Sequence, residues 1–99
     1  MLAPDPLDLA FVLVEKLMTE LPIDKDRIYV TGLCTGGVGT WTAIQRRPEF
    51  FAAAMPLCSG GDTAQAEKLK NIPIWAFHGQ ADNTVSVDNS RFMVEVIVS

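Results

Sequence analysis

Histidine, cysteine and clustered basic residues are all scarce in this sequence. It contains one histidine, His78, and two cysteines, Cys34 and Cys58. These residues are too few for a disulfide framework, and their spacing is not that of a metal site. We therefore expect no zinc centre, no other metal site and no disulfide framework. Lys and Arg total 8 against 12 acidic residues, the formal net charge is −4, and no basic run occurs. Nucleic-acid binding is therefore not expected, because phosphate contacts need clustered Lys and Arg.

Long apolar runs are also absent, and none reaches the roughly 18 residues of a membrane-spanning helix. The N-terminal residues lack the charged and apolar segments of a signal peptide, and the sequence does not specify a cellular compartment. Hydrophobic residues make up 48% of the 99 residues and charged residues only 20%. This balance is typical of one small domain that buries a core. No pattern in it requires a cofactor.

Four helices are predicted from apolar spacing and from their end signals. Asp5 and Pro6 have the residue types of an N-cap and a first helical residue, and Pro22 ends the helix that they begin. Further helices are expected at 38–47, 63–70 and 88–98, the last with Asp88 as its cap. The apolar stripe of the first helix consists of Leu7, Phe11, Val14, Met18 and Leu21.

Three short apolar runs between these helices are predicted to be strands. They are residues 27–31, 51–58 and 72–78, although the alanines of the second run suit a helix almost as well. Alternating helices and strands indicate a parallel sheet with helical crossovers. The runs are continuously apolar, as is typical of strands that are covered on both faces. We expect residues 1–99 to belong to one α/β domain.

The segment that joins the first strand to its helix carries the main chemical motif. Residues 32–36 read G-x-C-x-G, which matches the G-x-S-x-G nucleophile elbow with Cys34 in place of serine. A strand that turns at once into a helix crowds the backbone, so small flanking residues are needed. Cys34 would then project at a helix N-terminus, where the dipole favours a thiolate. The backbone N–H of Thr35 would be one oxyanion donor. A phosphate-binding loop is less well matched, because no Walker lysine follows.

The residues around this motif resemble a known family. Residues 23–37, 41–54 and 74–87 look like the corresponding segments of α/β-hydrolases, in particular esterases and predicted peptidases related to polyhydroxybutyrate depolymerases and phospholipase/carboxylesterases. The resemblance runs through nearly the whole chain. It implies the three-layer α/β-hydrolase core, here as a fragment with about three parallel strands and four helices. It also implies that Cys34 holds the nucleophile position and Asp82 the position of the triad acid.

Asp82 and His78 each have a second interpretation that needs no catalysis. Asp82 stands beside Asn83 in a turn-forming pair, although the His-Gly-x-x-Asp arrangement after a strand favours the acid position. His78 ends the third strand, whereas by the resemblance the catalytic histidine lies on a later loop, after the acid. We therefore interpret His78 as a structural residue packed under that loop. Cys58, at the end of the second strand, is interpreted as a small buried hydrophobic residue.

The resemblance predicts an ester hydrolase that acts on small ester-type substrates. It also implies that this sequence matches the middle of the domain, without the strands that would precede it or the catalytic histidine, so little activity is expected from this chain alone. Dienelactone hydrolases are an alternative, because they read G-x-C-x-G-G at the elbow and use a Cys-His-Asp triad. A non-catalytic, oligomer-forming module is the other alternative. A homo-oligomer is expected in any case, through a sheet face or edge that this chain leaves uncovered.

Overall fold

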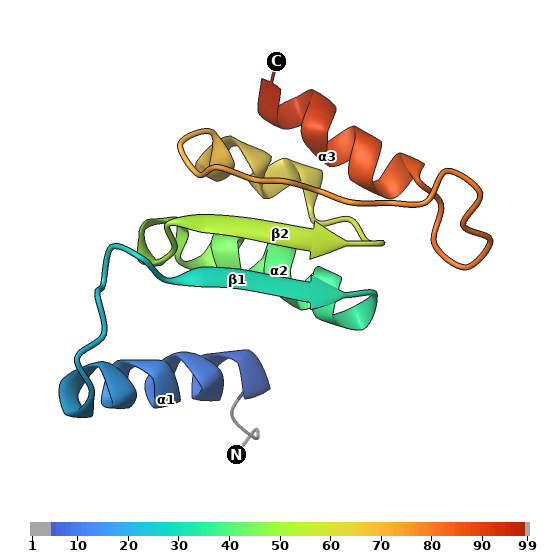
Figure 1. The fold of residues 1–99 in the computed structure, drawn as a ribbon. Coiled ribbons are helices and arrows are strands. Elements are labelled where there is room, and N and C mark those ends of the chain that lie inside the picture. Colours follow the sequence, from blue (N-terminus) through green and yellow to red (C-terminus); the bar gives the residue numbers. More distant parts are fainter. Residues whose placement is uncertain (1–4, 99) are drawn as a thin grey trace.

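The computed structural model describes residues 5–98, and Figure 1 shows their fold. Helix α1 (Pro6–Glu20) leads into strand β1 (Tyr29–Leu33), which turns into helix α2 (Thr35–Arg46). A short 3-10 turn, η1 (Pro48–Phe50), precedes strand β2 (Ala53–Leu57). The 3-10 helix η2 (Thr63–Leu69) follows, and helix α3 (Asp88–Val98) ends the described part.

Helix α1 begins as predicted from its cap. The Asp5 carboxylate accepts a hydrogen bond from the backbone N–H of Leu7 at 2.8 Å, and Pro6 occupies the first helical position. Phe11 is buried at 5% exposure and packs against Phe50 and Phe51. Leu21 lies beyond the end of the helix and is 52% exposed, so its assignment to the apolar stripe is wrong.

The sheet is parallel, and its strands stand in chain order. β1 pairs with β2 along its full length, from Tyr29↔Ala53 to Leu33↔Leu57. The third predicted strand is reduced to two isolated bridges, Ala54↔Ile74 and Leu57↔Phe77. The cause is Pro56, which has no N–H to donate where the ladder would continue between these bridges. Hydrogen bonds on either side of that gap keep the segment alongside β2, among them Trp75 N–H to Ala54 O and Phe77 N–H to Pro56 O, both 3.0 Å.

Three of the predicted helices differ from expectation at their ends or in type. Helix α2 begins at Thr35 rather than at position 38, because the chain turns into the helix directly after one residue. The segment predicted as a helix at 63–70 is the 3-10 helix η2, capped by the Asp62 carboxylate, which accepts from Ala64 N–H at 2.9 Å. Asp88 is the first residue of α3 and not its cap.

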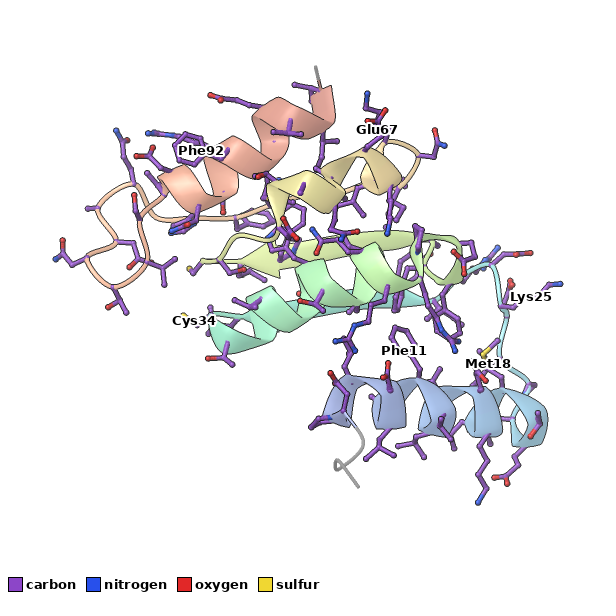
Figure 2. The ribbon with its side chains drawn as sticks, turned by 180° about the vertical axis from the view of Figure 1, so that it is seen from behind. Phe11, Met18, Lys25, Cys34, Glu67 and Phe92 are labelled. Carbon is purple, nitrogen blue, oxygen red and sulfur yellow. The ribbon has the colours of Figure 1, made fainter. Side chains whose placement is uncertain are left out.

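The core lies between the helices and one face of the sheet. In Figure 2, which views the molecule from behind, α2 lies in front of the strands. The buried cluster of this core consists of Trp41, Ile44, Ala54, Ala66, Leu69, Ile72 and Met93.

The opposite face of the sheet is open. Its strands alternate in burial, so that Tyr29 and Leu33 of β1 and Trp75 of the third segment are 65–69% exposed. A shallow apolar hollow on this face is lined by β1, β2 and the segment 73–75, with no helical residue among them. The described chain therefore has an uncovered sheet face, as expected for this chain alone, although its apolar runs are typical of strands that are covered on both faces.

Candidate active site

Cys34 is the single residue that separates β1 from α2. Its backbone has φ 54° and ψ −109°, a left-handed conformation that residues other than glycine rarely adopt. Such strain costs of the order of 1–3 kcal/mol and persists only where the surroundings hold it. Here the Cys34 N–H donates to Leu57 O at 2.9 Å, and the Cys34 carbonyl accepts from Val38 N–H at 3.0 Å. The strained strand-to-helix turn predicted by the G-x-C-x-G motif is thus present.

The glycines of the motif lie where β1 and α2 pack closely together. A Cβ added to Gly32 would lie 2.1 Å from the carbonyl oxygen of Gly36, so no larger residue fits at position 32. A Cβ added to Gly36 would meet no described atom within 4 Å. The sequence predicts that a larger residue would clash at either glycine of the motif. This prediction is correct for Gly32 and wrong for Gly36. Gly37, the glycine that directly follows the five-residue motif, faces β2, and its Cβ would lie 2.6 Å from Leu57 O.

The Cys34 side chain is solvent-exposed, and Figure 2 shows it at the end of α2 beside the strand ends. Thr35 is the first residue of α2, so its backbone N–H is among the first four, which have no acceptor within the helix. The helix dipole directs partial positive charge to this end. An exposed thiol beside such donors has the arrangement that acyl transfer requires of a nucleophile and an oxyanion site.

Asp82 lies in the loop that follows the third strand segment. One of its carboxylate oxygens, Oδ1, accepts hydrogen bonds from the backbone N–H groups of Val85 and Thr84, both at 2.9 Å. These two bonds, with a smaller contribution from His78, lower the pKa of Asp82 below its usual value. The carboxylate is therefore held in its charged form. Both the turn interpretation and the acid interpretation agree with these bonds.

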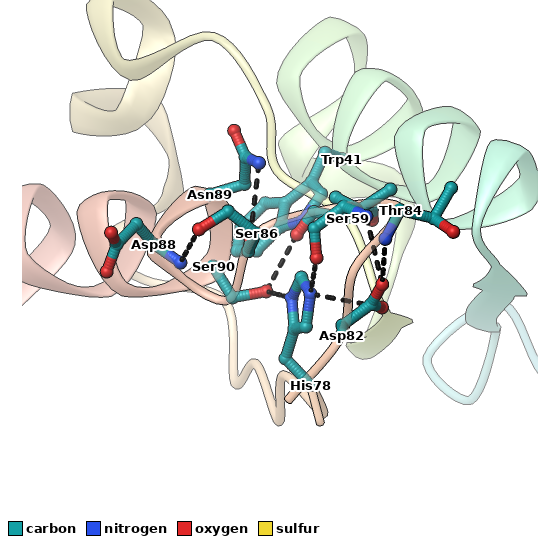
Figure 3. Close-up of polar contacts among 10 residues, drawn as sticks. Trp41, Ser59, His78, Asp82, Thr84, Ser86, Asp88, Asn89 and Ser90 are labelled. Carbon is teal, nitrogen blue, oxygen red and sulfur yellow. Dashed lines mark hydrogen bonds and ion pairs between the residues drawn. The ribbon is translucent and has the colours of Figure 1, made fainter. Parts of the chain in front are cut away.

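His78 is packed beneath this loop, as the sequence predicted. Its side chain is 3% exposed, and its Nε2 lies 2.7 Å from Val85 O and 3.5 Å from Asp82 Oδ2 (Figure 3). Because a carbonyl can only accept, Nε2 carries a hydrogen in the shorter contact. Nδ1 lies 2.8 Å from the hydroxyl oxygen of Ser90. With both nitrogens engaged and the ring buried, His78 is not placed to take a proton from Cys34.

Two serines that the sequence did not single out connect the histidine to the core. The Ser90 hydroxyl of α3 donates to Ser59 O at 2.7 Å, and Trp41 Nε1–H donates to the same carbonyl at 3.4 Å (Figure 3). The loop, α3 and the end of β2 are thereby joined in one network. No local pattern predicts it, because Ser59 and Ser90 are 31 positions apart.

Between residues 5 and 98, no group of three or more His, Cys, Asp or Glu side chains could hold a metal ion. No helix in that range is long and apolar enough to cross a membrane.

Comparison with known proteins places the site in a family of hydrolases. Residues 7–98 match the Dienelactone hydrolase family. A solved structure described as a thermostable esterase is similar, with a TM-score of 0.93 and 49% identity over 96% of this chain. The bifunctional acetylxylan esterase/xylanase XynS20E of Neocallimastix patriciarum is 31% identical over 75 residues.

The chain is much shorter than these relatives. It spans 25% of the esterase structure and 11% of the bifunctional enzyme. The match nevertheless includes the elbow, β2 and the Asp82 loop within residues 7–98. This chain belongs to the dienelactone hydrolase family and has the α/β-hydrolase fold.

Proposed function

We propose that this chain is the part of a carboxylic-ester hydrolase that runs from the nucleophile to the triad acid, within one partial domain, residues 1–99. Cys34 is the nucleophile, the Thr35 N–H is an oxyanion donor, and Asp82 is the acid that orients a catalytic histidine. The single observation that carries the proposal is the strained, exposed position of Cys34 between β1 and α2. That geometry leaves the thiol open to a substrate carbonyl.

In this mechanism the Cys34 thiolate attacks the carbonyl carbon of an ester. Negative charge develops on the carbonyl oxygen and is stabilised by the Thr35 N–H at the N-terminus of α2. Expulsion of the alcohol leaves a thioester on Cys34, which water must then hydrolyse. Both proton transfers need a base beside the thiol, and the one histidine of this sequence is buried and hydrogen-bonded elsewhere. We therefore expect acylation without efficient turnover.

The proposal is tested with p-nitrophenyl acetate and mass spectrometry. We expect a burst of at most one p-nitrophenolate per chain, acetylation of Cys34, and negligible steady hydrolysis. Cys34→Ala should abolish the burst, whereas the matched variant Cys58→Ala should retain it. Acetylation of Cys58 or of lysines in preference to Cys34 would contradict the nucleophile assignment. Steady hydrolysis that disappears in Cys34→Ala would contradict the expectation of inactivity.

A dienelactone-hydrolase-like activity is the second candidate. The family match over residues 7–98 and the cysteine at the elbow favour it, whereas the two similar proteins are both described as esterases, which favours the ester hydrolase. The two substrate classes are distinguished by the rate of Cys34 acylation with an enol lactone against that with a p-nitrophenyl ester. Faster acylation by the lactone would identify the lactone as the better substrate.

The chain is also proposed to associate with a second copy of itself, which is the oligomer expected from the sequence. The support is the open sheet face, where Tyr29, Leu33 and Trp75 are each about two-thirds exposed. The outer edge of β1 offers a second route, because in the described residues β1 pairs only with β2. Neither a nucleic acid nor a membrane is proposed as a partner.

A further inference from the structure

Cys34 and Cys58 occupy equivalent places at the ends of neighbouring strands. Each directly follows the last paired residues of the ladder, Leu33 and Leu57. The Cys34 N–H still donates to Leu57 O at 2.9 Å, so the ends of the two strands remain at sheet spacing where the cysteines lie. Strands in a sheet lie about 4.7–4.9 Å apart. Disulfides join residues whose Cα atoms are about 4.4–6.8 Å apart, so the backbone spacing suits one.

The two cysteines also share an unusual sign of the backbone angle φ. Within residues 5–98 they are the residues other than glycine with positive φ, 54° at Cys34 and 57° at Cys58. Each strand is therefore followed by a residue whose φ is one that residues other than glycine rarely adopt. Both thiols are free, Cys34 exposed and Cys58 half-buried. An accessible thiol with a second, more protected thiol beside it is the arrangement of a reactive cysteine and its resolving partner.

We propose that Cys34 and Cys58 form a redox-active pair that closes to an intramolecular disulfide. The oxidant is a small-molecule disulfide. The Cys34 thiolate attacks one of its sulfurs and forms a mixed disulfide, which releases one thiolate of the small molecule. The Cys58 thiolate then attacks the Cys34 sulfur and expels the second. The two cysteines lose two protons and two electrons, and the small disulfide is reduced to two thiols.

Closure of this disulfide would affect Cys34 as the proposed nucleophile. A sulfur held in a disulfide cannot attack an ester, so oxidation would silence Cys34 and a thiol reductant would restore it. This consequence rests on the proposed function, but formation of the disulfide does not. The pairing can therefore be tested without measuring any hydrolysis.

The experiment exposes the full chain to excess oxidised glutathione, followed by acid quenching, intact-mass analysis and peptide mapping. We expect a product that lacks two hydrogens, carries no glutathione, contains no free thiol and links the Cys34 peptide to the Cys58 peptide. In Cys58→Ser, the mixed disulfide should instead accumulate on Cys34. In Cys34→Ser, modification of the half-buried Cys58 should be several-fold slower.

One further measurement and the identity of the product can each refute the proposal. Closure should be at least several-fold faster in the native chain than in urea, because the strand register holds the thiols together. A wild-type product that stops at the mixed disulfide with Cys58 still free would overturn the pairing, and so would a product linked between two chains. Acylation of Cys34 without disulfide closure would refute this inference alone. Disulfide closure without acylation would refute the proposed function alone.

Discussion

The two thiols of this chain differ in access to solvent, and that difference decides which reacts first. Cys34 is exposed at the N-terminus of α2, whereas Cys58 is half-buried at the end of β2. Cys34 also directly precedes Thr35, so its thiol lies at the helix end whose first backbone N–H groups have no acceptor within the helix.

We expect a small alkylating agent at neutral pH to modify Cys34 several-fold faster than Cys58. Peptide mapping after brief treatment with iodoacetamide measures both rates in one sample. Treatment in urea serves as the control, since unfolding should remove the difference. Preferential modification of Cys58 in the native chain would count against the elbow.

At this scale the sequence identified residues with a local signature and missed those without one. The elbow at Cys34 was predictable because the glycines two positions away and the strand-to-helix context lie within one short segment. The burial of His78 followed from its place at a strand end. The positive φ of Cys58 and the contact of Ser59 with Ser90 were not predictable, because they depend on β2, the third strand segment and α3 coming together.

At the scale of single elements, two of the three glycines of α2, Gly37 and Gly39, differ in their surroundings. A Cβ on Gly37 would lie 2.6 Å from the backbone oxygen of Leu57 and 2.2 Å from the Ser59 hydroxyl oxygen. A Cβ on Gly39 would meet no described atom within 4 Å. The first glycine permits the helix to approach β2, and the second only weakens the helix.

We therefore expect opposite effects of the same substitution at these two positions. Gly37→Ala should destabilise the fold by about 1–3 kcal/mol, as is typical of overpacking against rigid backbone. Gly39→Ala should stabilise it by about 0.5–1 kcal/mol, the usual gain of alanine over glycine within a helix. Urea denaturation at one protein concentration measures both changes. Equal effects of the two substitutions would show that α2 does not lie against β2 as described.

Helix α1 is joined to α2 by charged side chains. Arg46 donates to the carboxylates of Asp5 at 2.9 Å and Asp8 at 3.1 Å. The hydrogen bond from Arg46, followed by that from the Leu7 N–H, lowers the pKa of Asp5. A lowered pKa in the folded state stabilises the fold fully above the unfolded value, which is about 3.9 for Asp. That contribution is lost as the pH falls through the folded value.

We expect acid to weaken the contribution that Arg46 makes to the stability of the fold. The difference in urea midpoint between wild type and Arg46→Gln should be present at pH 6 and should shrink as the pH is lowered below 4. Arg27→Gln is a suitable control, since Arg27 pairs only locally with Asp24 at 3.3 Å. An Arg46→Gln difference that stays constant down to pH 2 would exclude Asp5 as its titrating partner. The effect is expected to be small, because the side chains are more than a third exposed.

Element types and order were more predictable than their bounds and regularity. Alternation of apolar runs with helical periodicity is a property of sequence alone, so the parallel order of the strands was correct. The interruption of the third strand followed from Pro56 on its neighbour, which no pattern within residues 72–78 indicates. The early start of α2 follows from the elbow, where a turn and a helix share residues.

At the scale of the whole molecule, the described chain is a sheet covered on one side. Right-handed crossovers between strands that step in one direction place their helices on one face. The other face exposes Tyr29, Leu33, Met55, Trp75 and Phe77. At about 150–250 Å² per aromatic side chain, their exposed parts amount to on the order of 500 Å² of apolar surface. Soluble monomers rarely carry a larger contiguous patch.

A second copy is the simplest occupant of this face. A standard interface buries about 800 Å² on each partner, so this patch would supply its apolar centre and leave room for a polar rim. At about 25 cal/mol per Å², burying the patch on one partner would contribute about 12 kcal/mol before the costs of association. A two-fold symmetric dimer would cover the open sheet face of both copies in one interface.

We expect the chain to sediment above its monomer mass of 10.8 kDa and to dissociate on dilution. Trp75→Glu should shift the species toward monomer, because it places a charge on the open sheet face, where Trp75 is 69% exposed. Val12→Glu is the matched control, since Val12 is 62% exposed on α1, a helix that contributes no residue to the hollow on that face. Sedimentation velocity across a dilution series measures all three proteins. A monomer that unfolds cooperatively at micromolar concentration would refute self-association, and a shift in Val12→Glu alone would move the contact from the sheet to α1.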